Sequence, residues 1–135
     1  RRRPRGQEDR PRGPEPGREA CTYRSMSGEA VVTFKGNDLV VVSPEGAVAL
    51  DTHGFHNGTA LGVLRRALRA MQMDIVAQRD NVAADWSVSD GLALHRFSDG
   101  MAIKPKGAQH AARAGLLLRH YGHPEAEAVL AEVPG

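Results

Sequence analysis

One amphipathic stretch, residues 59–73, lies between two groups of short apolar runs, and it constrains the fold more than any other feature of the chain. Its apolar residues recur at helical spacing, whereas arginines fall on or beside the other face. This pattern predicts an α-helix with one buried face. The apolar positions are Leu61, Leu64, Leu68 and Met71. Because β-type runs lie on both sides of the helix, we expect it to cover a sheet built from both groups.

The first group of runs predicts a three-stranded meander before the helix. Residues 30–34 and 39–42 are rich in β-branched side chains and flank a turn sequence at 35–38. A second turn, 43–46, has proline and glycine at the favoured positions and leads into a run at 47–51.

The second group predicts further strands and then two helices. Asp90-Gly91 is a hairpin signal between two of the runs. The expected strands are 74–78, 85–89, 92–97 and 101–103, and the expected helices are 107–121 and 124–132. We therefore predict an α+β fold, with an antiparallel or mixed sheet from the two strand groups packed on helix 59–73 and a C-terminal helical pair over 107–132.

The N-terminal segment differs from the rest of the chain in charge. Residues 1–20 contain seven arginines and four acidic residues, a net charge of +3, and four of the eight prolines. Residues 21–135 contain eleven basic and twelve acidic residues, a net charge of −1. We expect 1–25 to be a disordered Arg/Pro-rich leader or an upstream extension. The single domain is then expected to span 26–135, from just before the first apolar run.

Composition excludes several classes of protein. Hydrophobic residues make up 41% of the 135 residues and charged residues 25%, which suits one globular domain. No run of 18 apolar residues or signal-peptide layout occurs, so we expect no membrane partner. A single cysteine, Cys21, excludes an internal disulfide and a cysteine zinc cluster. It fits a reducing compartment, and we expect a cytoplasmic protein.

The loop at 51–58 carries the first candidate site. Asp51, His53 and His56 are residue types that bind divalent metals, and loops between a strand and a helix often carry function. A metal-dependent enzyme is therefore one hypothesis. The alternative is a polar loop that caps the helix, with Asn57 or Thr59 accepting from its first amides.

The arginines of the helix form the second candidate site. One hypothesis is that this basic patch contacts the phosphates of a nucleic acid, together with the arginines of the leader. The patch consists of Arg65, Arg66 and Arg69, which lie close together on the predicted helix. The alternative is a solvated helix face. A helix-turn-helix does not fit, because the last predicted helix carries glutamates and no lysine or arginine. His120 and His123, at the break between the two C-terminal helices, are expected to cap a helix end.

No catalytic motif is present. The glycine-rich phosphate loops and the Gly-x-Ser-x-Gly elbow are missing, so we assign no catalytic residue and expect no cofactor. Our first hypothesis is a small non-enzymatic accessory or protein-interaction protein with a protein partner. A nucleic-acid-associated protein and a metal-dependent enzyme are the alternatives.

The order of the motifs resembles a group of short proteins. Val48–Leu68, the sequence Trp-Ser-Val-Ser-Asp-Gly at 86–91 and Arg96–Ile103 are similar to short uncharacterised proteins of bacteriophages and mobile elements. The resemblance covers roughly residues 30–104 and implies a strand, a loop, an amphipathic helix and a hairpin. It implies no activity, so no site residue follows from it.

Overall fold

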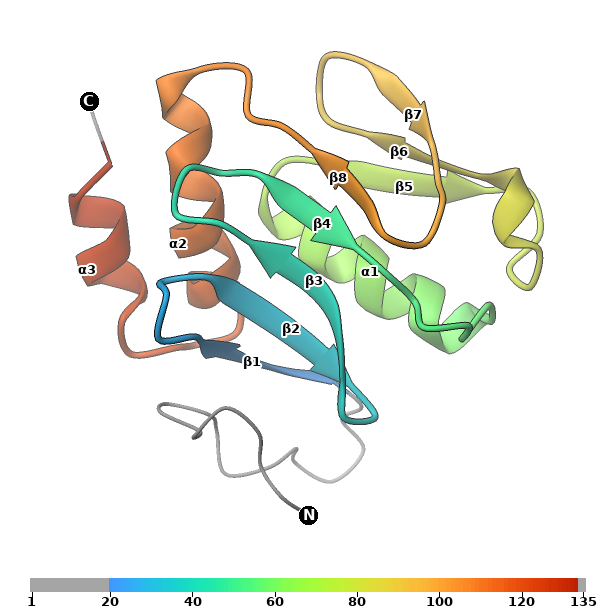
Figure 1. Cartoon of the computed structure of the whole chain (residues 1–135), viewed down its shortest axis with the longest axis horizontal. Coiled ribbons are helices and arrows are strands. Elements are labelled where there is room, and N and C mark those ends of the chain that lie inside the picture. The colour runs from blue at the N-terminus through green and yellow to red at the C-terminus, as the bar shows by residue number, and fades with distance from the viewer. Residues whose placement is uncertain (1–19, 134–135) are drawn as a thin grey trace.

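The computed structural model describes residues 20–133 of the chain, and an α-helix separates two groups of strands, as predicted (Figure 1). The elements in chain order are β1 (Ala20–Arg24), β2 (Ala30–Phe34), β3 (Asn37–Val42), β4 (Val48–Leu50), α1 (Gly58–Ala70), β5 (Asp74–Ala77), the short 3₁₀ helix η2 (Ala83–Asp85), β6 (Trp86–Ser89), β7 (Leu94–Arg96), β8 (Met101–Ile103), the 3₁₀ helix η3 (Ala108–Ala111), α2 (Ala112–His120) and α3 (Ala126–Ala131). The predicted α+β class is confirmed.

Within the described residues, the strands form two antiparallel sheets. The large sheet has the order β1-β2-β3-β4-β8, and the small sheet has the order β5-β6-β7. The predicted meander is confirmed as β2, β3 and β4. β8 comes from the second strand group but pairs with β4, so that Ile103 lies opposite Val48. The two strand groups of the sequence therefore do not correspond one to one with the two sheets.

The ordered fold begins earlier than the boundary predicted at residue 26. β1 pairs antiparallel with β2 from Ala20 opposite Phe34 to Arg24 opposite Ala30. The buried Thr22 hydroxyl donates to the Val31 carbonyl at 2.8 Å. Residues 20–24 thus belong to the large sheet, which corrects the assignment of the whole segment 1–25 to a leader. Residues 1–19 lie outside the described part.

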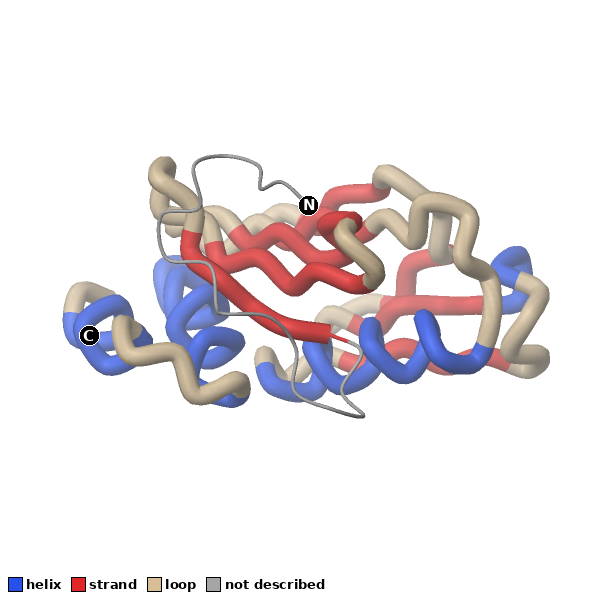
Figure 2. The backbone as a smooth tube through the Cα atoms, turned by 90° about the horizontal axis from the view of Figure 1, so that it is seen from below, coloured by secondary structure: helices blue, strands red, loops and turns tan. Residues whose placement is uncertain are grey.

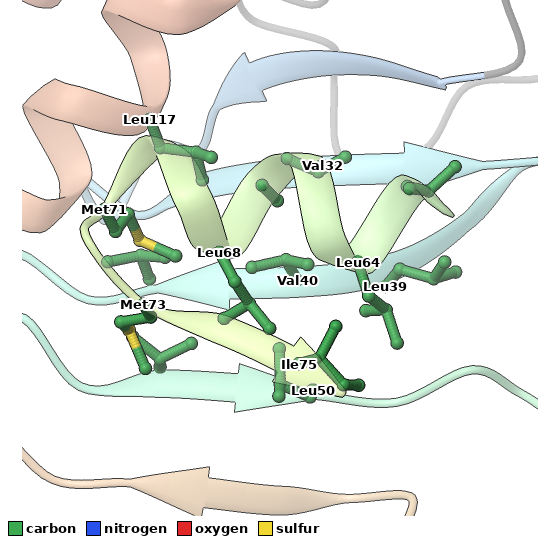
Figure 3. Close-up of a cluster of buried hydrophobic side chains, with 14 of the residues drawn as sticks. Val32, Leu39, Val40, Leu50, Leu64, Leu68, Met71, Met73, Ile75 and Leu117 are labelled. Atoms are coloured by element: carbon green, nitrogen blue, oxygen red, sulfur yellow. The ribbon is translucent and has the colours of Figure 1, made fainter. Parts of the chain in front are cut away.

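α1 packs its apolar face against the strands, as its sequence pattern predicts. Leu64 and Leu68 point toward Val40 and Leu50 of the large sheet and toward Ile75 of the small sheet (Figure 3). The buried residues of the helix are Ala60, Leu61, Val63, Leu64, Ala67 and Leu68. Burial of apolar surface of this kind contributes about 25 cal/mol per Å². The helix therefore joins the two sheets through one core.

Both ends of α1 have local causes. The Asn57 side chain accepts from the Ala60 N–H at 2.9 Å, which confirms one of the two predicted caps. At the other end Gln72 has a left-handed φ of 65°, and the Met73 N–H returns to the Leu68 carbonyl at 2.8 Å. The helix consequently ends at Ala70, three residues before the predicted end.

The C-terminal helices pack together beside the large sheet (Figure 2). Gly115 of α2 lies where a Cβ would come within 2.6 Å of the Leu130 side chain of α3, so the two helices approach closely at this position. The ring of His123 accepts from the Glu125 N–H at 3.0 Å, next to the start of α3. Among the described residues, none of the helices has the length and apolar character needed to cross a bilayer.

Candidate functional site

The loop that joins β4 to α1 is held by the turn between β7 and β8. Asp99 in that turn accepts from the Thr52 N–H at 2.6 Å and from the Thr52 hydroxyl at 2.8 Å. His56 Nε2 donates to the other oxygen of Asp99 at 3.0 Å. Burial by itself would raise the pKa of Asp99, but the hydrogen bonds from Thr52 and His56 lower it overall. Asp99 therefore fastens this loop to the neighbouring turn.

The structure does not bring the predicted metal ligands together. The Asp51 carboxylate accepts from the His53 backbone N–H at 2.8 Å, and the His53 ring donates to the Asp38 carbonyl at 2.8 Å. The His56 ring is bonded to Asp99 instead. No group of three or more His, Cys, Asp or Glu side chains in the described part of the chain is arranged to hold a metal ion. The loop matches the alternative prediction of a polar segment that caps α1.

The predicted arginine site is divided between two roles. Arg65 Nε and Nη2 each donate to the Ile75 carbonyl at 3.2 Å. Arg69 Nε donates to Asp74 Oδ1 at 3.1 Å, and that same oxygen accepts from the Ile75 N–H at 2.8 Å. Burial opposes the lowered pKa of Asp74, which results from the hydrogen bonds from Ile75 and Arg69. Arg66 is exposed on the helix.

These contacts cover the outer edge of β5 at Ile75. Hydrogen-bonded pairs alternate along an antiparallel ladder, and the pattern in the small sheet directs the N–H and C=O of Ile75 away from β6. Asp74 accepts from that N–H and Arg65 donates to that C=O. Both outward groups of Ile75 are therefore satisfied by side chains, one from Asp74 and one from Arg65 of the predicted arginine site.

The same alternation identifies the outward residues of β7. The Phe97 N–H donates to the Trp86 carbonyl at 3.0 Å, and the Ala93 carbonyl accepts from the Asp90 N–H at 3.1 Å. Between these two contacts, the backbone N–H and C=O groups of successive residues point alternately toward β6 and away from it. Those whose backbone groups point away from β6 are Leu94 and Arg96.

The outer edge of β7 has no cover within residues 20–133. No hydrogen bond from another described residue reaches the outward N–H and C=O groups of Leu94 and Arg96. The Leu94 side chain is 66% exposed, and Leu92 just before it is 72% exposed. Figure 1 shows β7 at the border of the small sheet, on the side opposite β5. Apolar side chains and unpaired backbone groups thus lie together at this edge.

A buried carboxylate fixes the position of β7. Asp90 accepts from the N–H groups of Leu92 and Ala93 at 2.7 Å each and from His95 Nε2 at 2.8 Å. Its side chain is 1% exposed, and Lys106 Nζ lies 3.1 Å from the same oxygen that His95 contacts. Burial alone would raise the pKa of Asp90, but these hydrogen bonds hold it well below its usual range. The Asp-Gly turn was predicted, whereas its bond to Lys106 was not.

Comparison of the chain with protein-family models, with curated proteins and with solved structures gives no match. The candidate site is therefore defined by geometry alone. It consists of the outer edge of β7, the exposed leucines beside it and the Asp90 network that holds them. Sequence patterns single out the hairpin but give no signal for an open edge, because that depends on which element lies next to the strand.

Proposed function

We propose that this chain is a small non-enzymatic protein-interaction protein, which binds an extended segment of another protein as an additional strand beside β7. The observation that carries this proposal is that the outward N–H and C=O groups of Leu94 and Arg96 have no hydrogen-bond partner among residues 20–133. Unpaired groups on a sheet edge form a template for a further strand. Several families of peptide-binding domains use this mode, in which backbone hydrogen bonds supply affinity.

The side chains at the edge support binding of a protein segment. Leu92 and Leu94 offer apolar surface that a partner strand would cover. Natural edge strands are usually protected by charge, by short length or by a covering element. β7 is short and carries Arg96, which limits unselective pairing, but no described element covers it. These features favour a partner with a defined sequence over general aggregation.

The Asp90 network supports the same function, because it holds β7 in place before a partner arrives. The carboxylate fixes the turn through two backbone amides and fixes the strand through His95. A strand that is already ordered loses little conformational entropy on binding, and this increases affinity.

The alternatives have less support. A nucleic-acid site on α1 would need Arg65 and Arg69, which are occupied at the β5 edge. A metal-dependent enzyme would need the ligands of the 51–58 loop at one point, and in the described residues they have separate partners. A cytoplasmic location and a likeness to short uncharacterised proteins of bacteriophages and mobile elements are predictions from the sequence.

Selection from a displayed library of random seven-residue peptides tests the proposal. Peptides are selected on the full chain and then screened against the variant Leu94→Pro. Proline at this position removes one outward N–H but no bond between β6 and β7, and edge positions tolerate it. We expect peptides that bind the wild-type chain and lose binding to Leu94→Pro by at least about tenfold, the effect of about 1.4 kcal/mol.

Val76→Thr is the matched control. Val76 is an exposed apolar residue on the same small sheet, 52% exposed, but it lies on β5. The selected peptides should bind this variant as they bind the wild-type chain. Circular dichroism and thermal unfolding check that each variant is folded. A selection that yields no binders, or binders that retain full affinity for a folded Leu94→Pro variant, contradicts the proposal.

A further inference from the structure

We infer that the segment bound at β7 runs antiparallel to it and carries an acidic residue followed two positions later by an apolar residue. This inference rests on the proposed function and identifies the chemistry of the partner. It follows from the charges around β7 and from the residues that face outward on it.

β7 itself carries one exposed positive charge, Arg96. Arg96 is exposed, and its guanidinium has only a long hydrogen bond of 3.4 Å to the Ala84 carbonyl and no ion pair with a described residue. Lys106 is 42% exposed, whereas the carboxylate that it contacts, Asp90, is buried. An acidic side chain on the partner would therefore find a cation at Arg96 that has no ion pair within residues 20–133, and the carboxylate of the Asp90 network is buried.

The order of residues in the partner follows from strand geometry. In a strand, alternate side chains share one face, so Leu94 and Arg96 point to the same face of the small sheet. In an antiparallel partner, the residue opposite Arg96 comes two positions before the residue opposite Leu94. A further apolar residue two positions later would lie near Leu92, which is also exposed. The expected pattern is acidic-x-apolar-x-apolar.

The antiparallel direction has a physical reason. Leu94 and Arg96 can each exchange two straight hydrogen bonds with an antiparallel partner, whereas parallel pairing is slanted and slightly less stable per residue. A parallel partner would have the reverse order, with the apolar residues before the acidic one. The sequence order of bound peptides therefore reports the direction of binding.

A second copy of this chain fits the edge less well. If two β7 strands paired antiparallel with the His95 residues aligned, each Arg96 would lie opposite Leu94 of the other copy. Neither guanidinium would then meet an acidic group of β7. Charge complementarity consequently favours an acidic segment of a different protein.

Synthetic peptides with blocked ends test the pattern directly. The probe Thr-Glu-Thr-Val-Thr-Val-Thr carries it. One comparison peptide has the same residues in reverse order, and the other has lysine in place of glutamate. We expect the probe to bind the full chain about threefold to fivefold more tightly than either one, as a cross-strand pair of up to about 1 kcal/mol implies. The difference from the lysine peptide should shrink at high salt.

Charge exchange identifies the contact. The variant Arg96→Glu should prefer the lysine peptide, and Lys104→Glu, an exposed charge outside β7, should keep the wild-type preference. Equal or tighter binding of the reversed or lysine peptide to the wild-type chain overturns the inference. If Leu94→Pro still abolishes that binding, the proposed function stands.

Two other outcomes separate the inference from the proposed function. One is a wild-type dimer, detected by light scattering, that the Leu94→Pro substitution dissociates. That result would mean that a second copy of the chain occupies β7, and it would overturn the inference of an acidic partner segment. Failure of all three peptides, when library peptides do bind at β7, also overturns the inference alone. Failure of the library as well contradicts the proposed function.

Discussion

The small sheet ends at β5 on one side and at β7 on the other, and the outward backbone groups on these edges have different surroundings. At β5, the N–H and C=O of Ile75 bond to Asp74 and Arg65. At β7, the corresponding groups of Leu94 and Arg96 have no partner among residues 20–133. Edges of natural sheets are commonly covered. The uncovered edge is thus where a partner strand can add.

The covered edge also explains the basic face of α1. Arg65 and Arg69 lie one helical turn apart, so both side chains reach the same strand. A basic patch in a helix sequence therefore has two meanings, a surface for phosphates or a cap for a neighbouring edge. The residue that distinguishes them here is Asp74, which pairs with Arg69 at the start of β5.

Removal of the Asp90 carboxylate should change the stability of the chain and binding at β7 the most, because this carboxylate holds β7 in place. In Asp90→Ala, the amides of Leu92 and Ala93 lose their acceptor and His95 loses its partner. We expect a loss of about 3 kcal/mol in the free energy of unfolding, measured with urea, and a loss of peptide binding at β7. Asp85→Ala, which breaks the pair with the exposed Arg79, should cost less than about 1 kcal/mol.

The same carboxylate gives a pH signature. The folded-state pKa of Asp90 is lowered from an ordinary value of 3.8. Its contribution to stability is therefore complete above that value and is lost as the pH falls toward the folded-state pKa. Urea unfolding from pH 5 to pH 2 should show a steeper loss for the wild-type chain than for Asp90→Ala. Equal slopes would mean that folding does not lower the pKa of Asp90.

Removal of the arginine that caps β5 should reduce stability less than removal of the Asp90 carboxylate. It should also leave an unpaired carbonyl on the β5 edge, so that this edge becomes more like the β7 edge. Arg65→Met keeps much of the side chain but removes both donors to the Ile75 carbonyl. We expect a loss of about 1 kcal/mol in unfolding free energy, since the arginine is partly exposed, together with concentration-dependent association. Arg66→Met, on the same helix but exposed, is the control and should change neither. Light scattering that shows equal association for the two variants would contradict the role of Arg65 as a cap.

The sequence predicted the elements that depend on local pattern. The apolar spacing in α1, its cap at Asn57 and the Asp90-Gly91 hairpin all arise from residues within a few positions of one another. Segment β1 was missed because Ala-Cys-Thr-Tyr-Arg is short and follows a polar, proline-rich stretch. Its strand conformation depends on β2, with which it pairs. Local pattern is weak evidence where a neighbouring strand decides the conformation.

The candidate site was harder to predict for the same reason. His53 and His56 are close in sequence, but their rings bond to Asp38 and Asp99, which the fold brings from either side of the loop. The edge of β7 is open because β8, the next strand in the chain, pairs with β4 of the large sheet and not with β7. Neither arrangement has a signature in residue spacing. The sequence pattern places Leu92 and Leu94 in an expected strand, but it does not indicate that they are exposed.

The smallest effect on stability should come from the open edge itself. Leu94→Thr removes an apolar side chain that is 66% exposed but retains a strand-favouring residue, so the unfolding free energy should change by less than about 0.5 kcal/mol. Val88→Thr makes a comparable change on the buried face of β6, where a hydroxyl would lack water, and should cost about 2 kcal/mol. Library peptides should bind Leu94→Thr more weakly than the wild-type chain. A large loss of stability in Leu94→Thr would mean that the leucine supports the fold, and that its exposure is not evidence for a binding edge.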